Sequence, residues 1–393
     1  MCYILACGIP KKVNGVKEEP AERARKKMLV MRKFMPGTGS VYGLVALLLA
    51  MAPAGAGFAS GPKSAPALPE PISPLQVRYQ LDIHGGGEIF PALTSCAPPH
   101  YWPIATLSML NTSSQPIMET VSAEIPDWSR QSLATVSLAP NETRTIQLNP
   151  ELLPQAYQNG EIRPATLEVR ASILGSAFGY NETRPVYLHS ASDLFWGTKY
   201  ANAEFIARWV TPHDTAVLQL VSSARDYVRR GRLAGYHLSG HSEPAVAAQV
   251  GDQARAVFAA MKLLGISYVD SISTYGKFAS HAERVRLPRE TLSMNSANCL
   301  DLSVAFASAM ENLGLEPVIV LLPGHAFTGV RLARGSSEIL YLDLTVMPDG
   351  TFDAATQRAH NWLQKTPKAQ INLIDIATAR SRQIYPMAEN IAP

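Results

Sequence analysis

The sequence predicts an α+β protein in which an N-terminal antiparallel β-sandwich precedes a domain of helices and an antiparallel sheet. Between residues 77 and 190, short segments of alternating apolar and polar residues are separated by turn residues, which is typical of a sandwich. From residue 191 on, apolar residues recur at helical spacing, and consecutive strand-like segments follow them. We therefore expect a leader region at 1–60, a proline-rich linker at 61–76, a β-sandwich domain at 77–190 and a second domain at 191–393.

The first 60 residues have the order of a secretory signal peptide. Basic residues such as Arg25 and Arg32 precede an apolar segment at 41–52 and a small-residue cleavage site near Ala56 or Ala59. The apolar segment has about 12 residues, whereas a helix that spans a bilayer needs about 20, so cleavage and export to the periplasm or the extracellular space are favoured. A membrane anchor through residues 41–52 is the alternative. Internal methionines leave the true start of the chain open.

The distribution of charge argues against a nucleic-acid partner. Residues 1–60 hold nine of the 35 Lys and Arg residues but three of the 32 Asp and Glu residues. From residue 61 on, acidic residues therefore outnumber basic ones by 29 to 26, although the whole chain has a formal net charge of +3. A mildly acidic mature protein lacks the basic surface that binds phosphate backbones.

The expected sandwich strands are short and are bounded by Asn, Gly and Pro residues. They lie at 104–110, 120–125, 134–138, 143–148, 165–173 and 186–188. We expect this region to act as a spacer or packing module, with ligand binding as the alternative.

The second domain is expected to contain both helices and strands. Apolar residues at helical spacing predict helices at 212–230, 244–264, 299–312 and 352–364. Strands are expected at 317–332, interrupted by Pro323-Gly324, at 339–345 and at 371–376.

Three residues of this domain have the types and the order of a thiol catalytic site. A nucleophilic thiol needs a setting that favours the thiolate, a base within hydrogen-bond reach, and a group that orients the base. Cys299 begins a predicted helix, where free backbone N–H groups and the helix dipole favour a thiolate. His325 begins a strand, and Asp343 lies on the strand after it. Asp301, in the first turn of the helix, is expected to stabilise the helix end and not to act as an acid catalyst.

The register of the two strands decides whether His325 and Asp343 meet. A three-residue loop, Ala333-Arg334-Gly335, would pair Arg331 with Ser337 and place His325 directly opposite Asp343 on one sheet face. A shift of one residue would turn Asp343 to the other face. The register is therefore a direct test of the proposed site.

The motifs Asn298-Cys299-Leu300-Asp301, Gly324-His325-Ala326-Phe327 and Leu342-Asp343 together resemble the transglutaminase-like superfamily, and particularly its bacterial members. The likeness is close over about 110 residues and looser over about 190. It implies a papain-type fold with Cys299 as nucleophile, His325 as base and then acid, and Asp343 as the residue that orients His325. Many members have Gly before the Cys and Trp two residues after the His, whereas this chain has Asn298 and Phe327.

The resemblance implies an exported enzyme that transfers acyl groups at amide bonds, as a cysteine protease or amidase or as a transglutaminase. Its substrate would be a protein or peptide. The alternative is an inactive transglutaminase-like module that binds a cell-envelope protein or wall component. The oxyanion donor stays open among the Cys299 backbone N–H, Tyr268 and Asn298.

We expect no cofactor and no metal in this site, and membrane contact only through an uncleaved N-terminal segment. The oligomeric state is not predicted. A disulfide between Cys96 and Cys299, the two cysteines of the mature chain, would remove the nucleophile, so we favour a free thiol.

Overall fold

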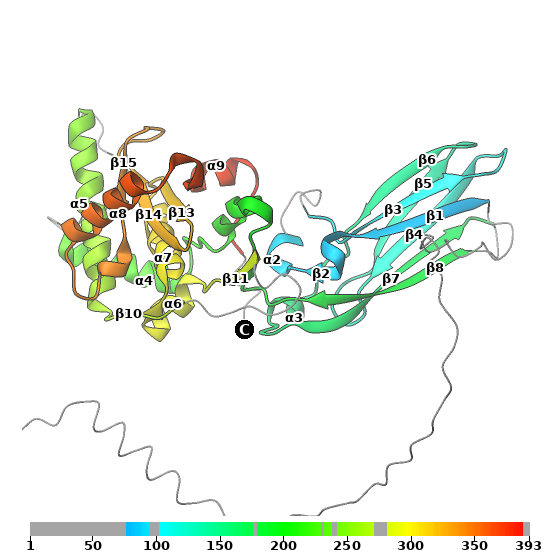
Figure 1. The fold of residues 1–393 in the computed structure, drawn as a ribbon, viewed down its shortest axis with the longest axis horizontal. Helices are drawn as coiled ribbons and strands as arrows, with labels where there is room; N and C mark the ends of the chain where they lie inside the picture. Colours follow the sequence, from blue (N-terminus) through cyan, green and yellow to red (C-terminus); the bar gives the residue numbers. More distant parts are fainter. Residues whose placement is uncertain are drawn as a thin grey trace, which may run out of the picture. The chain divides into compact units, whose positions relative to one another are not determined.

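The computed structural model describes residues 76–94, 102–175, 179–228, 232–237, 242–270 and 281–387. The described part is a mixed α+β structure with several separate sheets (Figure 1). The expected leader at 1–60 and the linker up to residue 75 lie outside the described residues. No helix in the described ranges is long and apolar enough to cross a membrane.

Two sheets make up the region between residues 77 and 188. One has three strands in the order β1-β3-β6, and the other has five in the order β2-β8-β7-β4-β5. The bounds are β1 Val77–Ile83, β2 Glu88–Ile89, β3 Ala105–Asn111, β4 Ile117–Glu124, β5 Ser132–Leu138, β6 Thr143–Leu148, β7 Arg163–Ile173 and β8 Gly179–Leu188. All neighbouring strands are antiparallel except β2 and β8, which are parallel.

Both sheets contribute to one hydrophobic core. Along β3 and β4 every second residue is buried, so each strand presents one face to the interior. Leu107 and Met109 from the three-stranded sheet share this core with Val121 and Leu167 from the five-stranded sheet. Strands form at all six predicted positions. Two were not predicted: β1, which begins at Val77, and the two-residue β2.

The second half of the chain combines helices with a four-stranded antiparallel sheet in the order β15-β14-β13-β16. The sheet strands are β13 Pro317–Leu322, β14 His325–Arg331, β15 Ile339–Leu342 and β16 Asn372–Asp375. The α-helices of the described chain are α2 Pro91–Thr94, α3 Pro154–Tyr157, α4 Thr215–Ala224, α5 Glu243–Leu263, α6 Pro288–Met294, α7 Cys299–Asn312, α8 Phe352–Lys365 and α9 Ile376–Ser381.

Short elements complete the structure. β9 Asp193–Phe195 pairs antiparallel with β11 Ala282–Arg284, and β10 Ser267–Tyr268 pairs parallel with β12 Ser296–Ala297. The 3₁₀ turns are η2 His84–Gly87, η4 Thr198–Tyr200, η5 Ala203–Arg208, η6 Arg225–Tyr227, η9 Leu344–Val346 and η10 Lys368–Gln370.

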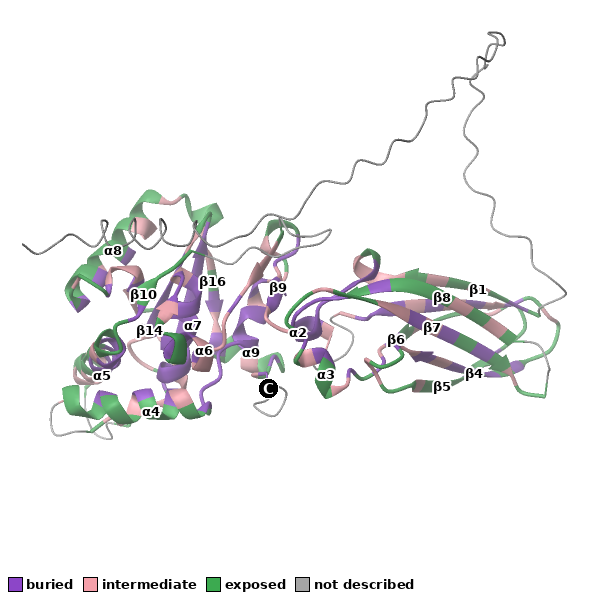
Figure 2. Cartoon of the chain, turned by 90° about the horizontal axis from the view of Figure 1, so that it is seen from below, coloured by how far each residue is buried: buried purple, intermediate pink, exposed green. Residues whose placement is uncertain are grey.

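Helix α7 is the central helix of this half, and its bounds are those that the sequence predicted. Asn298 caps it: the Asn298 side chain accepts a hydrogen bond from the Asp301 N–H, and the Asp301 side chain accepts one from the Asn298 N–H. Residues 300–310 are all buried, with α7 lying against the sheet (Figure 2). The helix ends before Gly314, whose φ of 73° needs a residue without a side chain.

The predicted register between β14 and β15 is wrong by two residues. Arg331 pairs with Ile339, not with Ser337, and Thr328 pairs with Leu342. The Leu332 N–H donates to the Glu338 carbonyl, and inside this pair the Ser336 N–H donates to the Ala333 carbonyl. The connection is therefore longer than the predicted three-residue loop. A shift of two residues keeps every side chain on its predicted face. The predicted strand at 339–345 also ends earlier, at Leu342, because Asp343 caps the 3₁₀ turn η9.

Residues near the N-terminal end of the described chain pack into the core of the second half. Phe90, Ala92 and Leu93 are buried in one cluster with Trp209 of the second half and Leu300 of α7. The core that includes α7 is therefore built from segments far apart in the sequence.

Candidate active site

Cys299 occupies the first position of α7 and is a free, partly buried cysteine. The two hydrogen bonds that cap α7 use the N–H groups of Asn298 and Asp301, and the Cys299 N–H takes part in neither. The thiol therefore lies at the positive end of a buried helix. Cys96 lies outside the described residues.

His325 begins β14 and contacts Asp343 directly: its Nε2 lies 3.0 Å from Asp343 Oδ2. Cys299 is one of the groups whose interaction raises the pKa of His325, so the thiol lies close to the imidazole. Since Asp343 occupies Nε2, Nδ1 is the ring nitrogen left for the thiol. The structure thus brings Cys299, His325 and Asp343 close together.

Asp343 is fully buried and is surrounded by hydrogen-bond donors. Its Oδ1 accepts hydrogen bonds from the backbone N–H and the hydroxyl of Thr345, at 3.1 and 2.6 Å. Its Oδ2 accepts a further hydrogen bond, 3.0 Å long, from Trp362 Nε1. Arg358 Nε lies 3.1 Å from the same oxygen. These contacts fix the carboxylate in one orientation, and sequence reasoning did not identify Thr345, Arg358 or Trp362.

Trp362 and Arg358 come from helix α8, which packs beside β15. The indole of Trp362 also lies over the imidazole of His325, with ring centroids 4.9 Å apart and planes inclined by 34°. It therefore covers the hydrogen bond between His325 and Asp343 from one side. The only sequence signal for these two residues was their place four apart on one face of an amphipathic helix.

The electrostatic setting keeps His325 protonated at neutral pH. Burial lowers the pKa of His325, but the hydrogen bonds and negative charges of Asp343 and Cys299 outweigh burial and raise that pKa to about 9. Burial alone would raise the pKa of Asp343, whereas the hydrogen bonds from His325 and Thr345 and the His325 charge hold it below its usual range.

Tyr268, on β10, is a second polar residue close to the thiol. Burial, followed by the negative charges of Cys299 and Asp270, raises the pKa of Tyr268 to about 12, so its hydroxyl stays protonated. Of the oxyanion donors considered from the sequence, Tyr268 is close to Cys299, and the Cys299 N–H belongs to the nucleophile itself. The Asn298 side-chain oxygen accepts the Asp301 N–H.

Asp301 is a structural residue of the helix end, as predicted. It is buried, accepts hydrogen bonds from the N–H groups of Asn298 and Arg286, and lies 3.5 Å from the Arg286 guanidinium. Burial raises the pKa of Asp301, against the effect of these hydrogen bonds. Its contacts to the cap and to Arg286 make it part of the support for Cys299.

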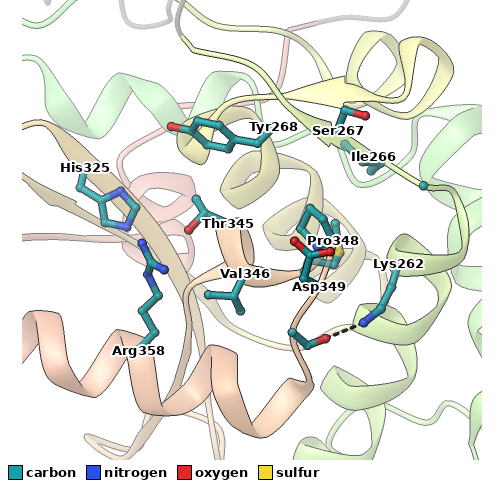
Figure 3. A pocket seen from close by; sticks show the side chains of 13 residues that line it. Lys262, Ile266, Ser267, Tyr268, His325, Thr345, Val346, Pro348, Asp349 and Arg358 are labelled. Atoms are coloured by element: carbon teal, nitrogen blue, oxygen red, sulfur yellow. Dashed lines mark hydrogen bonds between the residues drawn. The ribbon is translucent and has the colours of Figure 1, made fainter. Parts of the chain in front are cut away.

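A pocket of about 980 Å³ adjoins the triad (Figure 3). His325, Tyr268 and Arg358 line its triad end, and Lys262 and Asp349 line the other. Within the described ranges, no group of three or more His, Cys, Asp or Glu residues could hold a metal ion.

No protein-family model matches this chain. No curated protein matches it either.

Proposed function

We propose that this chain is an exported, thiol-dependent enzyme that transfers acyl groups at amide bonds of a protein or peptide, with a transglutaminase-like, papain-type fold. The observation that carries the proposal is one imidazole that hydrogen-bonds the buried Asp343 carboxylate and lies close enough to Cys299 for the thiol to raise its pKa. A thiol beside a base that an acidic group orients is the arrangement that nucleophilic catalysis requires.

In the first half of the reaction, the Cys299 thiolate attacks the carbonyl carbon of the amide and forms a tetrahedral intermediate. The Tyr268 hydroxyl and the Cys299 N–H are the donors placed to stabilise its oxyanion. The C–N bond then breaks, and the His325 imidazolium gives its proton to the leaving amine. The products of this half are a free amine and a thioester on Cys299.

In the second half, neutral His325 takes a proton from the attacking nucleophile, which adds to the thioester carbonyl. The carbon–sulfur bond breaks and the Cys299 thiolate is restored beside the imidazolium. Water gives a carboxylic acid, and an amine gives a new amide. We favour hydrolysis, since Tyr268 at 45% exposure lies beside the thiol and leaves the site open to water.

The remainder of the chain fits an exported enzyme. The two sheets of residues 77–188 share one core and would form a β-sandwich that acts as a spacer. The leader would direct export to the periplasm or beyond, or would hold the protein at the membrane through residues 41–52.

A thiol-directed probe that mimics an amide tests the proposal. We expect the folded mature protein to react at Cys299 at least about a hundredfold faster than free cysteine does, because a thiolate with an adjacent acid is a far better nucleophile. Cys299→Ala should abolish labelling, and Cys96→Ala, which removes the other cysteine of the mature chain, should preserve it.

If Cys299 reacts no faster than free cysteine, the chain is a binding module and not an enzyme. If it reacts faster, proteomics of peptide termini and of glutamine modification separates the two acyl acceptors. New peptide termini that depend on Cys299 indicate hydrolysis, and cross-linked glutamine indicates transfer.

A further inference from the structure

Arg358 stands at the triad end of the pocket and is not one of the residues that the proposed reaction requires. It lies on α8, lines the pocket together with His325 and Tyr268, and points toward the imidazole from below in the view of Figure 3. Its Nε lies 3.1 Å from Asp343 Oδ2. The guanidinium is therefore held in place next to the reacting atoms.

Only one edge of this guanidinium is occupied. Its side chain is 51% exposed, whereas that of Asp343 is fully buried. Among the described residues, Asp343 is its one ion-pair partner, and no hydrogen bond engages its Nη atoms. Asp343 has a single negative charge and also faces the His325 imidazolium. Two cations thus share one carboxylate, and the Nη atoms of Arg358 remain available to a ligand.

The two ends of the pocket carry cations in different settings. At the far end, Lys262 Nζ donates a 2.6 Å hydrogen bond to the Gly350 carbonyl, and Asp349 also lines the pocket. At the triad end, the Nη atoms of the half-exposed Arg358 have no partner among the described residues. A carboxylate that enters the pocket therefore finds a pair of unused charged donors at the triad end.

We propose that Arg358 is a specificity-determining residue that binds a carboxylate of the substrate next to the amide that Cys299 attacks. The inference rests on the proposed function, and it specifies the substrate class as an acidic peptide or acyl group. Planar guanidinium groups bind carboxylates through two parallel hydrogen bonds, and the two Nη atoms offer such a pair of donors. The carboxylate could be an Asp or Glu side chain or a chain terminus, because both present the same two oxygens.

Alkylation of Cys299 by a charged and a neutral reagent tests this role without knowledge of the substrate. Iodoacetate carries a carboxylate and iodoacetamide does not, yet both alkylate a thiolate in the same way. We expect Arg358→Gln to lower the ratio of the iodoacetate rate to the iodoacetamide rate about three- to tenfold, because the variant removes one nearby positive charge. The effect should shrink in 1 M salt.

The ratio separates anion binding from a general loss of reactivity, since a disturbed triad slows both reagents alike. Arg255→Gln is the matched control: Arg255 pairs with Asp353 of α8 and is 53% exposed, but it does not line the pocket. Its ratio should equal that of the wild type.

An unchanged ratio in Arg358→Gln overturns the carboxylate site, even if the amide-mimic probe shows a reactive Cys299. If Cys299 reacts slowly with both reagents and with the probe, the proposed function is contradicted. The rate ratio can still be measured in that case, so it tests the Arg358 site separately.

Protection experiments then identify the source of the carboxylate. Millimolar N-acetylglutamate α-amide presents a side-chain carboxylate, N-acetylglutamine presents a terminal one, and N-acetylglutamine α-amide presents none. We expect one of the two acids to slow iodoacetamide labelling of the wild type more than the neutral amide does, and to lose this advantage in Arg358→Gln. Equal protection by all three compounds contradicts the proposal.

Discussion

His325 is the residue on which the chemistry of the site converges. It contacts the Asp343 carboxylate and the Trp362 indole, lies close to the Cys299 thiol, and has a side chain that is 11% exposed. Burial alone would favour the neutral imidazole, yet the adjacent negative charges of Asp343 and Cys299 prevail. The protonated form is therefore the form that meets the substrate at neutral pH.

The raised pKa of His325 predicts the alkaline limit of activity. The imidazolium must donate a proton to the leaving amine, so turnover should fall about tenfold per pH unit above pH 9. Iodoacetamide alkylation needs no proton donor and should not fall in that range. Asp343→Asn removes a charge that raises the pKa of His325 and should move the limit toward lower pH.

An NMR titration of the His325 imidazole provides the direct measurement. A midpoint near the ordinary value of 6.5 would contradict the prediction. The raised pKa of His325 also makes the stability of the fold depend on pH. Protonated His325 stabilises the folded protein fully below about pH 6.5, and this stabilisation is lost as the pH rises through about 9.

The triad residues could be predicted from the sequence because residue type and order are sequence properties. Arg358 and Trp362 could not, because their roles depend on how α8 packs beside β15. Their helix was predicted, but an amphipathic pattern shows which side of a helix is buried and not which carboxylate it meets.

At the scale of elements, the pair β14 and β15 positions the catalytic groups. β14 begins with His325, and β15 leads directly into Asp343. The sequence indicated both strands, whereas their register depends on the length of the turn, which is two residues longer than predicted. His325 and Asp343 still meet, but beyond the paired residues, because Asp343 follows β15 as the cap of η9.

Gly329 allows β14 and β15 to approach closely, and its replacement should disturb the site. A Cβ there would lie 2.8 Å from Ile339 Cγ2 and 3.0 Å from the Leu340 carbonyl oxygen, both on β15. Gly329→Ala should therefore destabilise the protein by about 1–3 kcal/mol and slow probe labelling of Cys299, because β15 must shift and Asp343 shifts with it.

Denaturant unfolding and the labelling rate of Cys299 measure these two effects. Gly251→Ala, in the helix α5, is the control: nothing lies within 4 Å of its added Cβ, and Ala favours helix. That variant should be as stable as the wild type or more so, by up to about 1 kcal/mol. Equal stability of both variants would show that β15 tolerates the added methyl group.

At the scale of the whole molecule, a buried cluster of ionisable side chains joins segments far apart in the sequence. His189 Nε2 lies 2.7 Å from Glu88 Oε2, and its Nδ1 lies 3.5 Å from Asp193 Oδ2. Asp193 Oδ1 in turn accepts a 2.9 Å hydrogen bond from Arg284 Nε. Sequence patterns did not reveal this cluster because its members are single polar residues whose burial depends on distant segments.

Arg284→Met should destabilise the protein far more than the loss of a surface ion pair. Asp193 is fully buried and Arg284 is 16% exposed, so the variant leaves a carboxylate in the interior without its cation. Removal of one partner of such a pair costs about 3–5 kcal/mol.

Arg170→Met is the matched control, because Arg170 pairs with Glu168 at 2.6 Å but is 52% exposed. This variant should lower the stability by less than about 1 kcal/mol. Equilibrium denaturation with tryptophan fluorescence compares the two, and similar midpoints for both variants would show that the Arg284 pair contributes no more than a surface contact.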